Sequence, residues 1–184
     1  YHLQPGGVTR VIENTVQGWS ENGNDIQAVA ISGRPYPGDR LPNIRVVEGL
    51  DYASHEEAID PKILVNRIME SAREALGQAP DLWHIHNHSL GKNPSLTAAV
   101  ALLAESGERI LLHPHDFAED GRPGNYLSLR EVYKSTYPTG TNIHYAALNQ
   151  RDRGFLLNML KDSPSPVHLL ANAVPPSIPF PEPQ

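Results

Sequence analysis

The sequence predicts an α/β fold with a mostly parallel, doubly wound sheet in a three-layer sandwich. Short apolar runs alternate with helical patterns along the chain, as in proteins whose parallel strands are joined by crossover helices. The chain has 184 residues, of which 39% are hydrophobic, so it is long enough for one sizeable core and too short for two ordinary domains. We therefore expect a single domain.

The expected elements follow from these patterns. The apolar runs predict strands at residues 26–32, 43–49, 82–87, 109–113, 142–148 and 167–172. Apolar residues at helical spacing predict helices at 8–22, 61–76, 94–105, 128–133 and 151–160. Two helix starts are marked, because Asn93 precedes Pro94 as an N-cap and Asn149 is followed by Asp152 in a capping-box-like pattern.

The first expected helix carries one apolar face. That face comprises Val8, Val11, Ile12, Val16 and Trp19. Gly6 and Gly7 stand at the entrance of the helix, where the first backbone N–H groups have no partner inside the helix. Glycine there allows a phosphate or another backbone to approach these donors, although a simple tight turn also explains the pair.

Both ends of the chain are unusual for such a fold. A doubly wound sheet needs a strand before the first helix, and residues 1–3 are long enough only for the tail of one. This strand is therefore expected to be very short or to lack its beginning. At the other end, proline fills half of the last ten positions, which is typical of a stiff extended linker. We expect a domain over residues 1–173 and a linker over 174–184.

Composition narrows the class of protein. The formal net charge is -6, and the basic residues are scattered, which argues against nucleic acid or an anionic membrane as a partner. There is no cysteine, hence no disulfide and no thiolate zinc site, as fits a reducing cytoplasm. The longest apolar run, 98–104, is far shorter than a transmembrane segment. We expect a cytoplasmic protein with no transmembrane segment.

Three unusual stretches follow predicted strands: "QPGG" near the start, "HIHNHSLGKNP" from His84, and "HPHDFAEDGRPGN" from His113. In open α/β sheets, ligands bind beyond the carboxyl ends of the strands, where the strand order reverses. With the common order 3-2-1-4-5, these three stretches line one crevice. This convergence favours a ligand, rather than a turn alone, at Gly6 and Gly7.

Histidines dominate two of these stretches. His84, His86 and His88 alternate along an expected strand, as do His113 and His115, so each set points to one side. Imidazoles at this spacing bind zinc when a carboxylate joins them, they hydrogen-bond sugar hydroxyls when neutral, and some serve only the core.

Two residues just beyond the strand end, His115 and Asp116, are the stronger functional candidates. Arg151, at the start of an expected helix near the same crevice, could meet a phosphate or could pair with Asp152.

In their order and spacing, these stretches resemble the N-terminal half of retaining GT-B glycosyltransferases of the glycogen-synthase-like group. The matching segments are "PGGVTRVIENTVQGW", "DLWHIHNH", "ILLHPHD", "AALNQRDRGFLL" and "LLANAVP". The resemblance covers nearly the whole chain and implies a Rossmann-like domain over residues 1–173. It also implies that residues 174–184 lead to a donor-binding C-terminal domain that is absent from this sequence.

The resemblance further implies a reaction and roles for residues. A hexose is transferred from a nucleotide sugar to a carbohydrate or lipid-linked acceptor with retention, and this half alone is inactive. Gly6 and Gly7 lie against the diphosphate and acceptor, His115 reaches the transferred sugar, and Asp116 helps to hold the reacting groups. Donor or acceptor binding is also expected of His86, His88, His113 and Arg151, and neither a metal nor another cofactor is expected.

Two other functions remain open from the residues alone. The first is a metal-dependent hydrolase whose cluster comprises His84, His86, His113, His115 and Asp116. The second is a non-catalytic module that binds a carbohydrate or nucleotide in the crevice.

Overall fold

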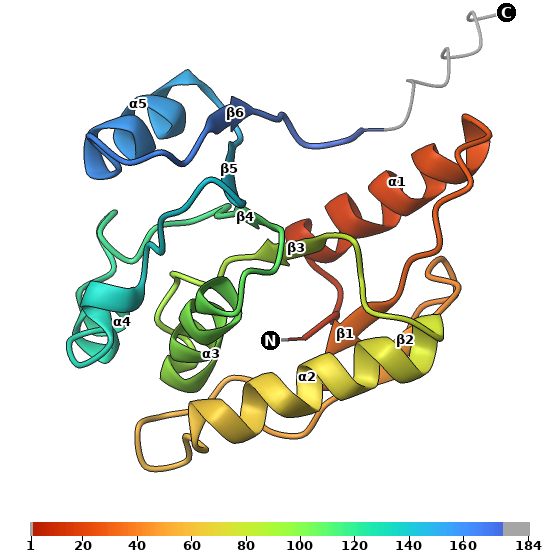
Figure 1. Ribbon diagram of the computed structural model, residues 1–184, viewed down its shortest axis with the longest axis horizontal. Helices are drawn as coiled ribbons and strands as arrows, with labels where there is room; N and C mark the ends of the chain where they lie inside the picture. Colours follow the sequence, from red (N-terminus) through yellow and green to blue (C-terminus); the bar gives the residue numbers. More distant parts are fainter. Residues whose placement is uncertain (1, 175–184) are drawn as a thin grey trace, which may run out of the picture.

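The computed structural model describes residues 2–174, and within them helices alternate with parallel strands (Figure 1). The strands are β1 (Ala30–Ser32), β2 (Ile44–Val46), β3 (Trp83–His86), β4 (Ile110–His113), β5 (Ile143–Ala147) and β6 (Val167–Leu169). The helices are α1 (Gly7–Glu21), α2 (Pro61–Leu76), α3 (Pro94–Glu105), α4 (Pro123–Ser128) and α5 (Gln150–Met159), with a 3-10 turn at Tyr133–Ser135.

The α/β class with parallel strands is confirmed, but the described strands form two sheets rather than one. One sheet contains β1 and β2, and the other has the order β3-β4-β5-β6. All pairs are parallel. The expected first strand is absent from the described residues, because His2 and Leu3 are not in a strand; the remainder of that prediction, Tyr1, lies outside them.

A single asparagine joins the ends of the two sheets. Asn93 is fully buried and its amide donates to the carbonyls of Gly49, at 2.8 Å, and Asp51, at 2.6 Å, which both follow β2. Its side-chain oxygen accepts from the backbone N–H of Leu96 and so caps α3, as predicted. The carboxyl ends of β2 and β3 therefore lie at the same edge of the molecule.

The core lies on one face of the four-stranded sheet. Alternate residues of three strands point to this face and are buried there or packed against it: Trp83 and Ile85, Ile110 and Leu112, Ile143 and Tyr145. Helix α3 contributes Leu96, Val100 and Leu103, and α5 contributes Leu156. The opposite face carries His84, His86 and His113, which are the alternate residues of β3 and β4.

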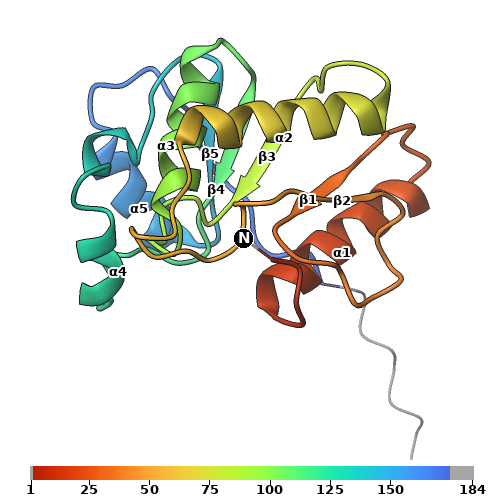
Figure 2. The same cartoon turned by 90° about the horizontal axis from the view of Figure 1, so that it is seen from below.

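Helix α1 lies on the other side of β1 and β2 from α2 (Figure 2). All five apolar residues of its predicted face line a cavity of about 1300 Å³. Val11 is buried, whereas Val8, Ile12, Val16 and Trp19 are only half-buried. The predicted helix is thus confirmed, and its apolar face looks into open space rather than into a filled core.

Most of the predicted helices and strands overlap the observed ones. The bounds of α2 and α3 match the prediction exactly at both ends, and the observed strands are shorter than the predicted runs. The helix predicted at 128–133 is wrong: Pro123 begins α4 earlier, and the chain forms turns between Leu129 and Val132. The linker prediction, apart from Val174, lies outside the described residues. Among the described residues, no helix combines the length and hydrophobicity that crossing a membrane requires.

Replacing Asn93 tests how far this one side chain holds the sheets together. N93A removes the α3 cap and takes the Asn93 donor away from two partly buried carbonyls, so the free energy of unfolding should fall by about 3 kcal/mol. The matched control is N149A, an exposed N-cap whose side chain bonds only Asp152 and whose loss should cost about 1 kcal/mol. Urea unfolding measures both variants, and equal losses would show that Asn93 is no more than a cap.

Candidate functional site

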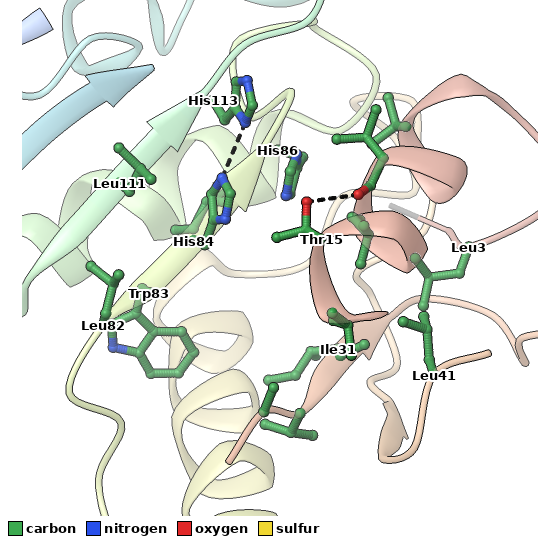
Figure 3. Close-up of a pocket in the computed structure, with 18 of the residues that line it drawn as sticks. Leu3, Thr15, Ile31, Leu41, Leu82, Trp83, His84, His86, Leu111 and His113 are labelled. Carbon is green, nitrogen blue, oxygen red and sulfur yellow. Dashed lines mark hydrogen bonds between the residues drawn. The ribbon is translucent and has the colours of Figure 1, made fainter. Parts of the chain in front are cut away.

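The cavity between the two sheets brings residues of all three unusual stretches together. Figure 3 shows His84, His86 and His113 among the residues that line it. Gly6 and Gly7 line it from the start of α1, His86 and His113 from the ends of β3 and β4, and Asp116 from the loop after β4. His115 is not among the residues that line the cavity, but it lies beside one of them, because its Nε2 is 2.9 Å from Nδ1 of His86. Six of the eight residues that the sequence predicts for the site lie in or beside this cavity.

Four of these histidines form two hydrogen-bonded pairs. His84 Nε2 lies 3.1 Å from His113 Nδ1, and the two rings are stacked with an angle of 8° between their planes. The His86–His115 pair lies beside them, with 5.2 Å between the ring centres of His86 and His113. The alternation of β3 and the register that pairs His86 with His113 produce this block of imidazoles.

Burial keeps these imidazoles neutral near pH 7. It lowers the pKa of His84 to about 4 and that of His113 to about 3, and the neighbouring histidines lower both further. The pKa of His86 falls well below its usual value for the same reasons. Burial also lowers the pKa of His115, although the Asp116 carboxylate opposes this effect. A neutral imidazole donates one hydrogen bond and accepts another, which suits recognition of a hydroxyl group.

Asn87 positions the two strongest candidates, and sequence reasoning missed it. Its side-chain oxygen accepts from the backbone N–H of His115, at 2.6 Å, and of Asp116, at 3.2 Å. Its backbone has φ 55°, in the left-handed region that asparagine tolerates better than most residues. An asparagine at the last position of a predicted strand, just before a turn, was the available signal.

Asp116 and Arg151 belong to separate ion pairs. Asp116 pairs with Arg122 at the end of the same loop, and both side chains are partly exposed. Arg151, at the start of α5, pairs with Asp120 at 2.8 Å and is 74% exposed. Arg151 does not line the cavity, so the structure does not bring it to the other predicted residues.

His88 also lies apart from the cavity. It has no exposed surface, and its Nε2 donates to the carbonyl of Thr136 at 2.8 Å. Burial lowers the pKa of His88 to about 4. It lies in the loop after β3 and is fully buried, which is the position of a core residue.

The glycine pair leaves the start of α1 open. Gly6 and Gly7 are exposed, and a Cβ atom added to Gly7 would meet no atom within 4 Å. Thr9 Oγ donates to the carbonyl of Gln4 at 2.7 Å and so holds the loop before the helix. The unpaired N–H groups of the first turn and the positive end of the helix dipole therefore face open space, where an anion fits.

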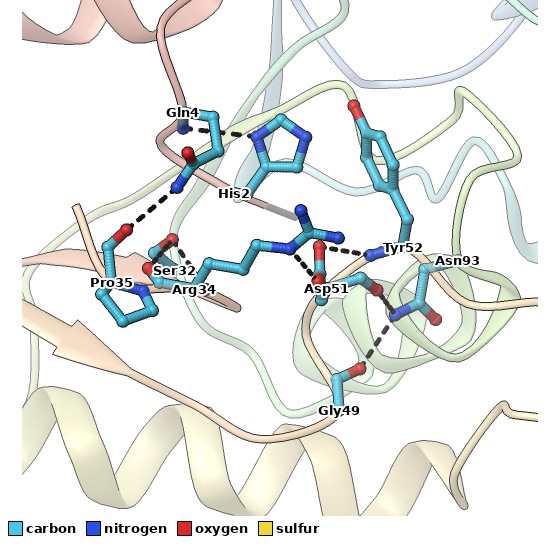
Figure 4. Close-up of polar contacts among 9 residues, drawn as sticks. All are labelled: His2, Gln4, Ser32, Arg34, Pro35, Gly49, Asp51, Tyr52 and Asn93. Carbon is cyan, nitrogen blue, oxygen red and sulfur yellow. Dashed lines mark hydrogen bonds and ion pairs between the residues drawn. The ribbon is translucent and has the colours of Figure 1, made fainter. Parts of the chain in front are cut away.

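A polar cluster beside the cavity was also missed by sequence reasoning (Figure 4). Arg34 pairs with Asp51, whose other oxygen accepts from the backbone N–H of Tyr52 at 2.8 Å. The Tyr52 ring contacts the His2 ring, with 4.6 Å between ring centres, and lies 5.6 Å from Lys92 Nζ. These residues come from four segments that lie far apart in sequence, which explains why no local pattern revealed them.

Among the described residues, one group has the geometry to hold a metal ion. His84, His86 and His113 each offer a ring nitrogen, and these atoms lie within 4.8 Å of one another. Three neutral imidazoles are a common donor set for zinc. The two other members of the hydrolase cluster considered from the sequence, His115 and Asp116, are not part of this group.

Because buried histidines are neutral in the folded state, stability should decrease as the pH falls. An unfolded histidine binds a proton below about pH 6.5, whereas folded His88 resists protonation until about pH 4. Stability should thus be greatest above pH 6.5 and fall as the pH drops from about 6.5 toward 4. Thermal melts between pH 7.5 and 4.5 measure this dependence.

The matched variants for this test are H88Q, which keeps a donor for Thr136, and H55Q in an exposed loop. H88Q should flatten part of the pH dependence, and H55Q should leave it unchanged. A stability that is constant from pH 7 to 5 would contradict the burial of neutral imidazoles.

Comparison with known proteins gives one informative relative. The chain is similar to mannosylglucosyl-3-phosphoglycerate synthase of Petrotoga mobilis, with 28% identity over 170 residues. The match covers 85% of this chain and 33% of that protein, so the chain spans about a third of the relative's length. No family model and no solved structure matches the chain.

Proposed function

We propose that this chain is the N-terminal, acceptor-side domain of a retaining GT-B glycosyltransferase. Its similarity to a glycosyltransferase carries the proposal. The cavity includes residues at the carboxyl ends of β3 and β4, which supports the proposal because such edges are where α/β sheets bind ligands. In this proposal residues 1–173 form the domain, residues 174–184 link it to a donor-binding domain, and this half has little activity alone.

The proposed reaction transfers a hexose from a nucleotide sugar to an acceptor hydroxyl. The relative is named for a product in which mannosyl and glucosyl groups are joined to 3-phosphoglycerate. An anionic glycoside is therefore the first acceptor class to test. The bond between the anomeric carbon and the diphosphate oxygen breaks, and a new bond to the acceptor oxygen forms with the same anomeric configuration.

The start of α1 is the proposed binding site for the diphosphate. Negative charge develops on this leaving group as the sugar departs, and helix N–H donors that are already oriented stabilise that charge without rearrangement. Gly6 and Gly7 are exposed at this position, so the phosphates can approach the backbone closely.

His115 and Asp116 are the proposed contacts to the reacting groups. His115 is largely neutral at pH 7 because burial lowers its pKa, so it acts as a hydrogen-bond partner of a sugar hydroxyl rather than as a cation. Asn87 fixes both residues through their backbone N–H groups. The Asp116 carboxylate lies at the cavity, where it can accept a hydrogen bond from the sugar or the acceptor.

Substitution of His115 in the full-length polypeptide tests this proposal. H115A should lower kcat by about a hundredfold or more, since removing one oriented polar group of an active site has effects of this size. H55A, an exposed loop histidine, is the matched control and should retain activity. The assay follows transfer of labelled hexose from GDP-mannose and UDP-glucose to glucosyl-3-phosphoglycerate, and proton NMR gives the anomeric configuration. Equal kcat values for the two variants would remove His115 from the site.

The three-histidine group favours a second candidate, a metal-dependent hydrolase. Metal analysis of the purified protein separates the two functions. The glycosyltransferase proposal predicts that transfer persists after chelation with EDTA and that H84Q leaves the metal content unchanged. Stoichiometric zinc that is lost together with a hydrolytic activity in H84Q would favour the hydrolase.

A further inference from the structure

We propose that Lys92 and Arg34 bind the anionic group of the acceptor, a phosphate or a carboxylate, and that the Tyr52 ring packs against the rest of the same molecule. These three residues belong to the loop cluster, which consists of His2, Arg34, Asp51, Tyr52 and Lys92. The inference rests on the proposed function, since it assigns a place to the acceptor of that reaction.

The loop cluster lies beyond the carboxyl ends of three strands. Arg34 comes shortly after β1. Asp51 and Tyr52 come after β2, and Lys92 comes in the loop between β3 and α3. Sheets of α/β proteins bind their ligands at this edge. The convergence of three loops there is the arrangement of a binding site rather than of a single turn.

Glycine at position 33 lets the first two of these loops meet. A Cβ atom on this residue would overlap the backbone nitrogen of Asp51, so no other residue type fits without a movement of the loop. Ser32 Oγ donates to the carbonyl of Arg34 at 2.8 Å and holds the turn. The close approach of the loops brings the Arg34 side chain to Asp51, with which it forms an ion pair.

Two further hydrogen bonds attach the loop after β3 to the loop after β2. The Ala53 N–H donates to the carbonyl of Lys92 at 2.9 Å, and the buried Asn93 amide donates to the carbonyl of Asp51 at 2.6 Å. The backbone is therefore fixed on both sides of Tyr52. A site that is ordered before its ligand arrives loses less conformational entropy on binding, which favours affinity.

The loop cluster carries more positive than negative charge. Arg34 and Lys92 are cations, and Asp51 supplies the one carboxylate of the cluster. Within residues 2–174 the Arg34 side chain bonds only to Asp51, and it does so through Nε, so its terminal nitrogens can donate to a ligand. Guanidinium and ammonium groups bind phosphate and carboxylate through charge-assisted hydrogen bonds. The positive surplus is local, because the chain as a whole has a net charge of -6.

The Tyr52 ring joins this charge to the cavity. Tyr52 is 43% exposed and lines the cavity, and Lys92 Nζ lies 5.6 Å from the centre of its ring. Figure 4 shows the Arg34 side chain extending toward the rings of Tyr52 and His2. An exposed aromatic ring offers a flat apolar surface on which the C–H groups of a sugar can pack. A ligand held by Lys92 and Arg34 would thus lie against this ring.

Tyr52 also relates the anion site to the proposed reacting groups. Asp116 lines the same cavity. Burial raises the pKa of Tyr52, and the carboxylates of Asp51 and Asp116 raise it further, although Arg34 opposes them. The Asp116 carboxylate is therefore near Tyr52. An acceptor whose anionic group lies at Lys92 can direct a hydroxyl group of its sugar toward Asp116.

Binding to the full-length polypeptide tests the subsite without any need for activity. Isothermal titration calorimetry compares 3-phosphoglycerate with glycerol 3-phosphate, glycerate and glycerol. We expect 3-phosphoglycerate to bind, its affinity to fall as salt is added, and glycerol not to bind. Tighter binding of glycerol 3-phosphate than of glycerate assigns the subsite to a phosphate, and the reverse assigns it to a carboxylate. No binding of any of these anions overturns the proposal.

Substitution of Lys92 tests the residue itself. K92Q should weaken the binding of 3-phosphoglycerate by about tenfold or more, because it removes a charge-assisted hydrogen bond. K92R keeps the charge and should retain most of the affinity. The matched control is K161Q, at an exposed lysine after α5, which should leave the affinity unchanged. Equal dissociation constants for K92Q and K161Q would remove Lys92 from the subsite and overturn the proposal.

The transfer assay separates this subsite from the proposed function. K92Q should raise KM for glucosyl-3-phosphoglycerate by about tenfold or more and leave kcat and KM for the nucleotide sugar nearly unchanged. An acceptor without an anionic group, glucosylglycerol, should serve K92Q and K161Q equally well. An unchanged KM for the anionic acceptor overturns the subsite and leaves the glycosyltransferase proposal standing. Binding that K92Q weakens, in a protein that transfers no hexose, overturns the glycosyltransferase proposal and keeps the anion site.

Discussion

The hydrogen bonds of Asn93 are the interaction on which the arrangement of this site depends. A buried amide that bonds the loop after β2 and caps α3 brings the carboxyl ends of both sheets to one edge. With this alignment, residues from the start of α1, the end of β3 and the loop after β4 line one cavity. Leaving any of these buried groups without a partner would cost more than the bonds themselves contribute, so the alignment is strongly specified.

The fold determines both the positions and the charge of the four paired histidines. Strand register places four imidazoles side by side, and burial then disfavours their protonation. Four cations in so small a space would repel one another strongly, whereas neutral rings pair through N–H···N bonds. The result is a polar but uncharged group of imidazoles in and beside the cavity. Such a group suits a sugar, whose hydroxyl groups both donate and accept.

Much of the fold could be predicted because its signals are local. Asn93 with Pro94, and the periodicity of 61–76, fix the starts and faces of two helices within a few residues. The helix at 128–133 was mispredicted because Pro123 set the start elsewhere. The alternation predicted that these histidines share a face. It did not predict that His88 is fully buried, because its hydrogen bond is to Thr136, 48 residues away in sequence. Asn87 bonds His115 across 28 residues and Arg34 pairs with Asp51 across 17 residues, and no local pattern encodes such contacts.

The hydrogen bond between His86 and His115 also couples the tautomers of these two rings. Between His86 Nδ1 and His115 Nε2 only one nitrogen carries the shared proton. When His115 Nε2 carries it, the Nδ1 of His115 accepts from a ligand; when His86 Nδ1 carries it, His115 Nδ1 becomes a donor. A ligand that donates and a ligand that accepts therefore select different protonation patterns in both rings. Because of this hydrogen bond, Nδ1 of His115 can be either a donor or an acceptor while both rings stay uncharged.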